Sequence, residues 1–143
     1  MRRFSHTTVL PVDAARVWEA LQDPTTWEAI GGVDRITDVR RDREGRLMGY
    51  RFSSTIGRVS YAGVANTVRA EPGRLMEVEV ASRDLDGSIL IRLEPGEEDT
   101  KMSVTVQLRP KGLMAAMAFP AISAAVGRGL PANVEEFASR IVG

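Results

Sequence analysis

The sequence predicts an α+β domain in which a curved antiparallel sheet of about seven strands wraps around a long C-terminal helix, with two short helices after the first strand. Three observations lead to this fold class. From Val33 to Leu108 apolar residues recur with a period of two, which is typical of strands. Ahead of that stretch, one strand is followed by a capped amphipathic segment. Past Pro110 the period becomes helical and stays so to the last residues.

Composition limits the classes of function. At 143 residues, with 43% hydrophobic and 27% charged residues, the chain is expected to form one domain over residues 1–143. Nineteen basic residues balance nineteen acidic ones, so no net charge attracts nucleic acid. Cysteine is absent, which excludes disulfides and thiolate metal sites. Met1 to Thr8 lacks the apolar core of a secretory signal, and we expect a cytoplasmic protein.

The first strand and the first helix are predicted from local chemistry. Phe4 to Leu10 is rich in threonine, valine and leucine, and Pro11 ends its hydrogen-bond ladder. Asp13 is a good N-cap for the segment that follows. Val17 and Leu21 lie at helical spacing and form its apolar face.

A second short helix follows a break in the chain. Asp23-Pro24 stops the first helix, because the residue before a proline disfavours the helical conformation. Thr25 to Ile30 is expected to add one further turn. Gly31-Gly32 then has the backbone freedom to turn the chain into the sheet.

Six further strands are expected in succession, separated by turn residues. They are Asp34 to Asp42, Leu47 to Ile56, Arg58 to Ala70, Leu75 to Ser82, Ser88 to Glu94, and a last strand with Met102, Val104, Val106 and Leu108 facing inward. The turns are expected at Arg43 to Arg46, Gly57, Glu71 to Gly73, Asp86-Gly87 and Pro95 to Asp99. In the strand from Leu47, alternation puts one set of side chains toward the core: Met48, Tyr50, Phe52, Ser54 and Ile56.

The C-terminal helix has two parts of different character. Leu130, Val134, Phe137 and Ile141 form one stripe, whose burial contributes about 6 to 12 kcal/mol before ordering costs. Pro120 and Pro131 each remove a helical hydrogen bond, so a kinked or segmented helix is expected, with Pro131 in the first turn of its last section.

The run from Gly112 to Gly127 is uncharged and apolar on nearly all sides. Its 16 residues fall short of the about 20 that a membrane-spanning helix needs. An ordinary surface helix does not have this pattern, so something is expected to cover it. A dimer partner, a membrane surface and a ligand channel remain open as candidates.

A sheet wrapped round a helix leaves a space between them, and this space is a candidate ligand site. The inward rows, the aromatic residue before Gly31-Gly32 and the adaptable methionines supply its candidate lining. The ligand-binding candidates are Trp27, Met48, Tyr50, Phe52, Tyr61, Val78, Met102, Val104, Met114, Met117 and Ile122.

Reactive groups are scarce. His6 is the only histidine, so no metal site is expected, and no phosphate-binding, dinucleotide-binding or hydrolase motif occurs. No cofactor is predicted. If the space holds a reaction, the candidate catalytic residues are Tyr50, Tyr61 and Arg83, of which the tyrosines offer a hydroxyl to a carbonyl of the guest.

The order of elements, with V-D-A-A-R-V-W-E-A-L-Q-D-P near the start, resembles the helix-grip superfamily of START lipid-transfer domains, Bet v 1-like proteins and polyketide cyclases. Four short motifs are most similar to the CoxG group, named for an accessory protein of carbon monoxide dehydrogenase operons. They lie at Ile30 to Val33, Ile56 to Val59, Tyr61 to Gly63 and Asp86 to Pro95. This resemblance implies a lipid-like or quinone-like ligand, sometimes bound near a membrane.

Three functions follow as hypotheses. The first is binding or transport of a hydrophobic small molecule of lipid, quinone or polyketide type in the internal cavity. The second is a polyketide cyclase or aromatase that acts in the same cavity by positioning a reactive chain. The third is a docking accessory or assembly factor that uses the apolar Gly112 to Gly127 segment. Peripheral membrane contact and a homodimer are both compatible with that segment.

Overall fold

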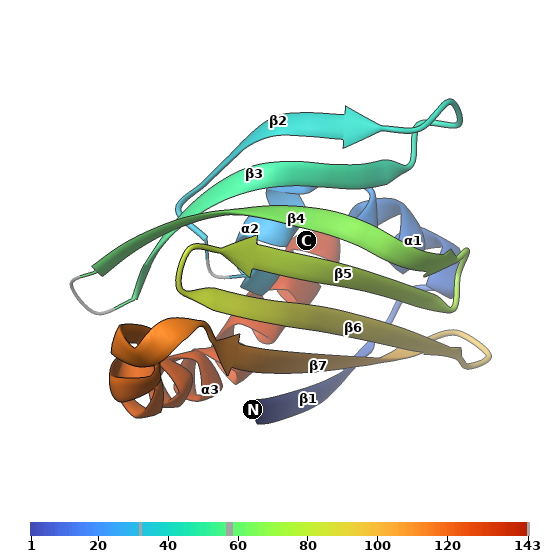
Figure 1. Cartoon of the computed structure of the whole chain (residues 1–143). Helices are drawn as coiled ribbons and strands as arrows, with labels where there is room; N and C mark the ends of the chain where they lie inside the picture. The colour runs from blue at the N-terminus through green and yellow to red at the C-terminus, as the bar shows by residue number, and fades with distance from the viewer. Residues whose placement is uncertain (32, 57–58, 143) are drawn as a thin grey trace.

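The computed structural model describes residues 1–31, 33–56 and 59–142 (Figure 1). Seven strands and three helices follow one another along this part of the chain. They are β1 (Arg2–Leu10), α1 (Ala14–Leu21), α2 (Pro24–Gly31), β2 (Arg35–Arg41), β3 (Leu47–Ile56), β4 (Val59–Glu71), β5 (Leu75–Ser82), β6 (Leu85–Pro95), β7 (Thr100–Pro110) and α3 (Gly112–Val142). The predicted α+β order is confirmed.

All seven strands form one curved antiparallel sheet in the order β1-β7-β6-β5-β4-β3-β2. Consecutive strands from β2 to β7 are hairpin neighbours, whereas β1 pairs with the last strand. The segment with α1 and α2 therefore crosses from one edge of the sheet to the other. In Figure 1 it passes behind the sheet, on the side where the C-terminal part of α3 lies.

The two short helices form where the sequence predicts them. The Asp13 side chain caps α1 by accepting a hydrogen bond from the Arg16 backbone N–H at 2.9 Å. Beyond α1, the Asp23 side chain accepts from the Thr25 backbone N–H at 3.0 Å and supports the start of α2. Gly31 ends α2, while Gly32 lies outside the described residues.

The core lies between the sheet and the C-terminal half of α3. The predicted stripe of Leu130, Val134, Phe137 and Ile141 is buried, as are the inward residues of β7. Of the kinked or segmented helix expected at Pro120 and Pro131, the segmented form is wrong, because α3 is one continuous helix from Gly112 to Val142. The residues that precede the two prolines, Phe119 and Leu130, are both buried, and this packing holds the helix where hydrogen bonds are lost.

The turn predicted at Asp86-Gly87 is wrong. Both residues lie inside β6 and pair with β5 and β7, and the turn falls at Arg83-Asp84. Gly87 is needed for close approach of strands rather than for a turn. A Cβ atom at this position would lie 2.7 Å from the backbone oxygen of Gln107 on β7.

The inward direction predicted for Met48 is also wrong. Its side chain is 39% exposed, whereas Leu47 and Tyr50 are buried. The register explains this: Arg40 pairs with Gly49 and Arg41 with Leu47, so Met48 is an extra residue in a β-bulge. Past the bulge the predicted alternation of Tyr50, Phe52 and Ser54 holds. The turn predicted at Gly57 lies outside the described residues.

Candidate functional site

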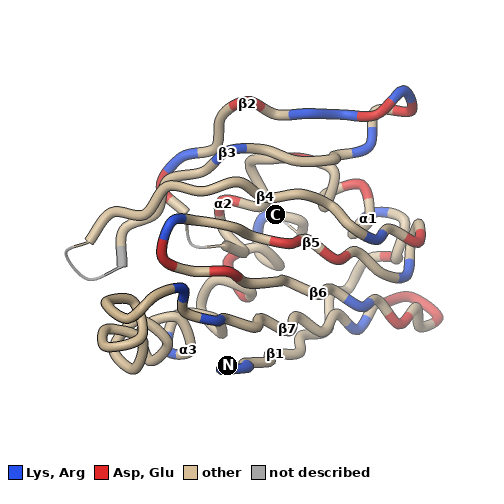
Figure 2. Tube along the Cα trace, viewed as in Figure 1, with Lys and Arg blue, Asp and Glu red and all other residues tan. Residues whose placement is uncertain are grey.

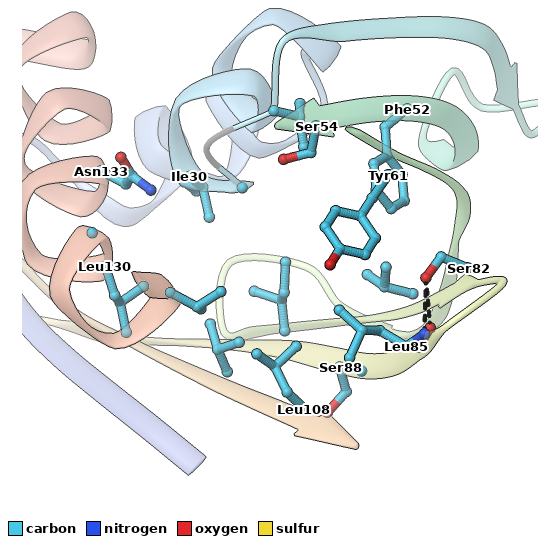
Figure 3. Close-up of a pocket in the computed structure, with 18 of the residues that line it drawn as sticks. Ile30, Phe52, Ser54, Tyr61, Ser82, Leu85, Ser88, Leu108, Leu130 and Asn133 are labelled. Carbon is cyan, nitrogen blue, oxygen red and sulfur yellow. Dashed lines mark hydrogen bonds between the residues drawn. The ribbon is translucent and has the colours of Figure 1, made fainter. Parts of the chain in front are cut away.

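A cavity of about 290 Å³ lies between α3 and one end of the sheet face that this helix covers (Figure 3). Strands β3 to β7, the last residues of α2 with Val33 after them, and the middle of α3 line it. Its volume is just below the range of about 300 to 1,000 Å³ that is usual for small-molecule sites. The cavity follows from the fold, because the other end of the same face is filled by α1, α2 and the last turns of α3.

Three predicted ligand-binding residues, Tyr50, Phe52 and Tyr61, do line the cavity. Tyr50 is only 4% exposed, and burial raises the pKa of its phenol above the ordinary value near 10. The hydroxyl therefore stays protonated at neutral pH and can donate a hydrogen bond. The Tyr50 hydroxyl is not hydrogen-bonded to any described residue. Among the described residues every fully buried side-chain polar atom has a hydrogen-bond partner, so the Tyr50 hydroxyl is not fully buried and opens onto the cavity.

Polar groups enter the cavity from two opposite sides. Figure 3 shows the Tyr61 hydroxyl pointing into it from β4, with Asn133 on the facing side from α3. In the described part of the chain, neither side chain is hydrogen-bonded to another residue. Sequence reasoning missed Asn133. Its signal was its spacing from Val126 and Gly129, which puts all three on one helix face beside the buried stripe.

The cavity wall carries almost no charge. Asp86 is the only charged residue among the described residues that line it. Its carboxylate is engaged by Lys111 Nζ at 3.2 Å and by the Arg109 guanidinium at 3.8 Å. An ionised head group placed inside would therefore lose its hydration without gaining a partner of opposite charge.

Four other predicted residues belong to the packed end of the sheet face instead. Trp27, Val78, Met102 and Val104 are at most 1% exposed and contribute to the main core. The Trp27 indole N–H donates to the Leu21 backbone oxygen at 2.7 Å, which fixes the ring between the short helices. None of the four lines the cavity.

The remaining predicted residues lie outside the cavity for different reasons. Ile122 packs with Leu85 and Phe119 in a second cluster, against which Tyr61 rests. Met114 and Met117 are 81% and 74% exposed on the outer side of α3. Arg83 is exposed at the turn between β5 and β6, and Met48 is on the bulge. Alternation and apolar character predicted that these residues line the cavity. Whether a residue does so depends on which helix or strand covers it in the fold.

No group of three or more histidine, aspartate and glutamate side chains in the described residues is arranged to hold a metal ion. His6 lies away from the cavity. Its Nε2 atom is 3.0 Å from a carboxylate oxygen of Glu135, and this contact joins β1 to α3. The Glu135 pKa is lowered by hydrogen bonds from His6 and from Thr8.

An antiparallel sheet that grips a C-terminal helix, with a cavity between the two, defines the helix-grip class of proteins. The chain belongs to the family described as polyketide cyclase / dehydrase and lipid transport, which it matches over residues 1–141. No curated protein matches the chain significantly.

Solved structures share this fold over nearly the whole chain. The ZhuI aromatase/cyclase from Streptomyces sp. R1128 has a TM-score of 0.80 at 16% identity, covering 98% of this chain and 93% of its own. A START superfamily protein from Mycobacterium smegmatis has a TM-score of 0.66 at 14% identity, with 94% and 97% covered. The protein Ara h 8.0201 has a TM-score of 0.60 at 14% identity, with 99% and 97% covered. At such identities the likeness shows the fold alone, and the predicted helix-grip fold is confirmed.

Proposed function

We propose that this protein binds and carries a neutral hydrophobic small molecule in the cavity between the sheet and α3. One observation carries the proposal: the wall is mostly apolar, and its polar groups in the described residues are uncharged or already paired. Such a wall stabilises an apolar body by burial and orients it with a few hydrogen bonds.

The polar groups narrow the chemistry of the guest. Tyr50 and Tyr61 offer hydroxyl donors, and Asn133 offers both a donor and an acceptor. A molecule with one or two rings and a carbonyl or hydroxyl oxygen at its edge satisfies them. This fits the quinone-like guest that the resemblance to the CoxG group implies. A fatty acid fits poorly, because its carboxylate has no free cationic partner among the described lining residues.

A matched pair of fluorescent probes tests this preference. 2-Naphthol and 2-naphthoate share one ring body and differ in the charge of the head group at pH 7. We expect 2-naphthol to bind at least about tenfold more tightly, since the carboxylate loses hydration without compensation. Equal or tighter binding of 2-naphthoate would show that the cavity contains a cationic partner, and would contradict a neutral guest.

A cavity-filling variant tests the location. An added Cβ atom at Gly129 meets only Asn133 Nδ2, at 3.7 Å, so Gly129→Leu is expected to fill the space without a clash at its first atom. It should abolish 2-naphthol binding while the protein stays folded by circular dichroism. Ala132→Leu, at an exposed position of the same helix, is the matched control and should bind normally. Native mass spectrometry of both proteins will identify any guest that co-purifies. Full binding by a folded Gly129→Leu protein would place the site elsewhere.

A second candidate, a cyclase acting in the same cavity, is favoured by the two tyrosine hydroxyls that face it. They can donate to a ketone oxygen and so assist ring closure in a chain held in position. Arg51 on β3 and Arg69 on β4 could not assist from outside the cavity, because their side chains are 67% and 55% exposed. The test is conversion of a synthetic poly-β-keto thioester, followed by the absorbance of an aromatic product. Activity that is lost in Tyr61→Phe while binding is kept would favour the cyclase over the carrier.

A further inference from the structure

The first turns of α3 present large apolar side chains to solvent. Leu113, Met114 and Met117 are 80%, 81% and 74% exposed. Between them and along the next turns the exposed residues are small and apolar. We call this surface the apolar face of α3, formed by Leu113, Met114, Ala116, Met117, Ala118, Pro120 and Ala121. Contiguous exposed apolar surface of this kind marks an interaction site rather than ordinary solvent-facing helix.

The opposite side of the same turns is held firmly. Ala115, Phe119 and Ile122 are buried, and the latter two pack on Leu85 at the start of β6. α3 is the one helix in the described chain with the length and composition to cross a membrane. Only 28% of its apolar 18-residue stretch is buried in the domain, so most of that stretch is open to an outside partner. Because its C-terminal half belongs to the core, the helix in this fold can only lie along a surface.

Positive charge surrounds the apolar face, although the whole chain has a formal net charge of zero. Lys111 precedes it, and Arg128 follows on the same helical stripe as Leu113, Met117 and Ala121. Arg2 lies beside the end of β7, where it pairs with Leu108. Six basic residues lie on the segments around the start of α3, which are the start of β1, the turn between β5 and β6 with the first residues of β6, the end of β7, and α3 as far as Arg128; they are Arg2, Arg3, Arg83, Arg109, Lys111 and Arg128. The acidic residues on these segments are Asp84 and Asp86, and Asp86 pairs with Arg109 and Lys111.

The opposite end of the sheet carries charges of both signs, but its loop between β6 and β7 is acidic, with three consecutive carboxylates from Glu97 to Asp99. With six basic and two acidic residues around the start of α3, the rest of the chain carries thirteen basic and seventeen acidic residues. Figure 2 shows this red loop far from the start of α3, where the nearest coloured segments are mostly blue. The molecule therefore has a charge dipole although its net charge is zero, and the apolar face lies at the positive end.

We propose that the apolar face of α3 docks on the surface of an anionic lipid bilayer. An apolar helix face with flanking lysine and arginine is the pattern of helices that lie in the membrane interface. A second copy of the chain is a worse occupant. A two-fold dimer would bring the same six cations against themselves, and three large side chains fall short of the 20 to 30 residues a side of a standard stable interface, about 800 Å² per partner.

Docking in this orientation brings the cavity close to the lipid. Phe119 and Ile122 lie on the inner side of the docking turns, and they pack with Leu85 and Tyr61, which line the cavity. One helical layer then separates the bilayer from the guest. Docking itself does not depend on the proposed carrier function, but its role in exchanging a guest with the membrane rests on that function.

Vesicle sedimentation tests the docking. We expect the protein to bind vesicles of phosphatidylcholine with about 30% phosphatidylserine at least about tenfold better than pure phosphatidylcholine, and to release them as salt rises. The double variant Met114→Gln/Met117→Gln should lose binding at least about tenfold. Arg3→Glu/Arg128→Glu should lose it at low salt. Met48→Gln is the matched control, since Met48 is an exposed methionine distant from α3, and it should bind as the unmodified chain does.

Two results would overturn the proposal. One is failure of the unmodified chain to bind phosphatidylserine vesicles at low salt. The other is a dimer in solution that Met114→Gln/Met117→Gln converts to monomer, which would assign the face to a second copy. The same variant should still bind 2-naphthol, because neither methionine lines the cavity. Loss of vesicle binding with retained 2-naphthol binding therefore separates failure of docking from failure of the carrier function.

Discussion

Both halves of α3 carry large apolar side chains, but the two halves place them in opposite environments. In the C-terminal half Leu130, Val134 and Phe137 are buried against the sheet, whereas in the first half Leu113 and Met117 are in solvent. The difference is one of position. In Figure 1 the start of α3 lies beyond the end of β7, while its last turns pass behind the sheet. Apolar composition predicts that a helix will be covered, but the extent of the sheet decides which part the domain itself covers.

The largest expected effect is a difference in the free energy of unfolding between variants in the two halves of α3. Phe137→Ala should lower the free energy of unfolding by about 3 to 5 kcal/mol, because it leaves a cavity in a fully buried site. Met117→Ala should change it by less than about 0.5 kcal/mol. Urea unfolding of both variants measures the contrast. A large loss in Met117→Ala would mean that the first half of α3 is covered in solution by a second copy.

Two glycines of α3 differ in how closely the rest of the fold packs against them. An added Cβ atom at Gly127 would lie 2.5 Å from the Phe4 ring, while at Gly129 it meets only Asn133 Nδ2 at 3.7 Å. Both positions gain helix propensity on substitution by alanine, by about 1 kcal/mol. We therefore expect Gly129→Ala to stabilise and Gly127→Ala to be less stable than it by about 1 to 3 kcal/mol. Thermal unfolding would contradict this if the two variants gained equally.

Tyr50 belongs to the core and also lines the cavity, and its phenol makes the stability of the fold depend on pH. Its pKa is raised by burial, so above pH 10 the unfolded chain loses this proton while the folded chain keeps it. Stability should then fall as pH rises, by up to about 1.4 kcal/mol per pH unit from this group. Tyr50→Phe should remove that part of the decline. Urea midpoints between pH 8 and 11 (an interval set about the ordinary tyrosine value) measure it, with Tyr61→Phe as the comparison at the other cavity tyrosine.

Sequence periodicity predicted most of the fold because a period fixes which side of an element is apolar. It gave the strand from Leu75 to Ser82 and the buried stripe of α3 correctly. It failed where tertiary contacts decide. The bulge at Met48 depends on the register with β2, and the placement of Gly87 within a strand depends on its close approach to Gln107.

The candidate site was predicted less completely than the fold, for a related reason. Tyr50, Phe52 and Tyr61 were found because they lie on inward rows, and they line the cavity. Inward rows continue past the cavity into the packed core, so the same argument also selected Met102 and Val104. Only the positions of α1 and α2 separate the hollow end of the sheet from the filled end, and no local pattern contains that information.

The smallest expected effect concerns the contact between His6 and Glu135, which ties β1 to the buried half of α3. The Glu135 pKa is lowered, chiefly by the hydrogen bond from His6, so the folded chain holds this carboxylate ionised to lower pH than the unfolded chain. The stability it contributes is present above the ordinary glutamate pKa and is lost as pH falls through the lowered value. Because Glu135 is 56% exposed, Glu135→Gln should cost less than about 0.5 kcal/mol at pH 7, and the difference should vanish in acid. Chemical unfolding at pH 7 and pH 3 measures it, and a cost that grows in acid would show that the contact does not stabilise the fold through its charge.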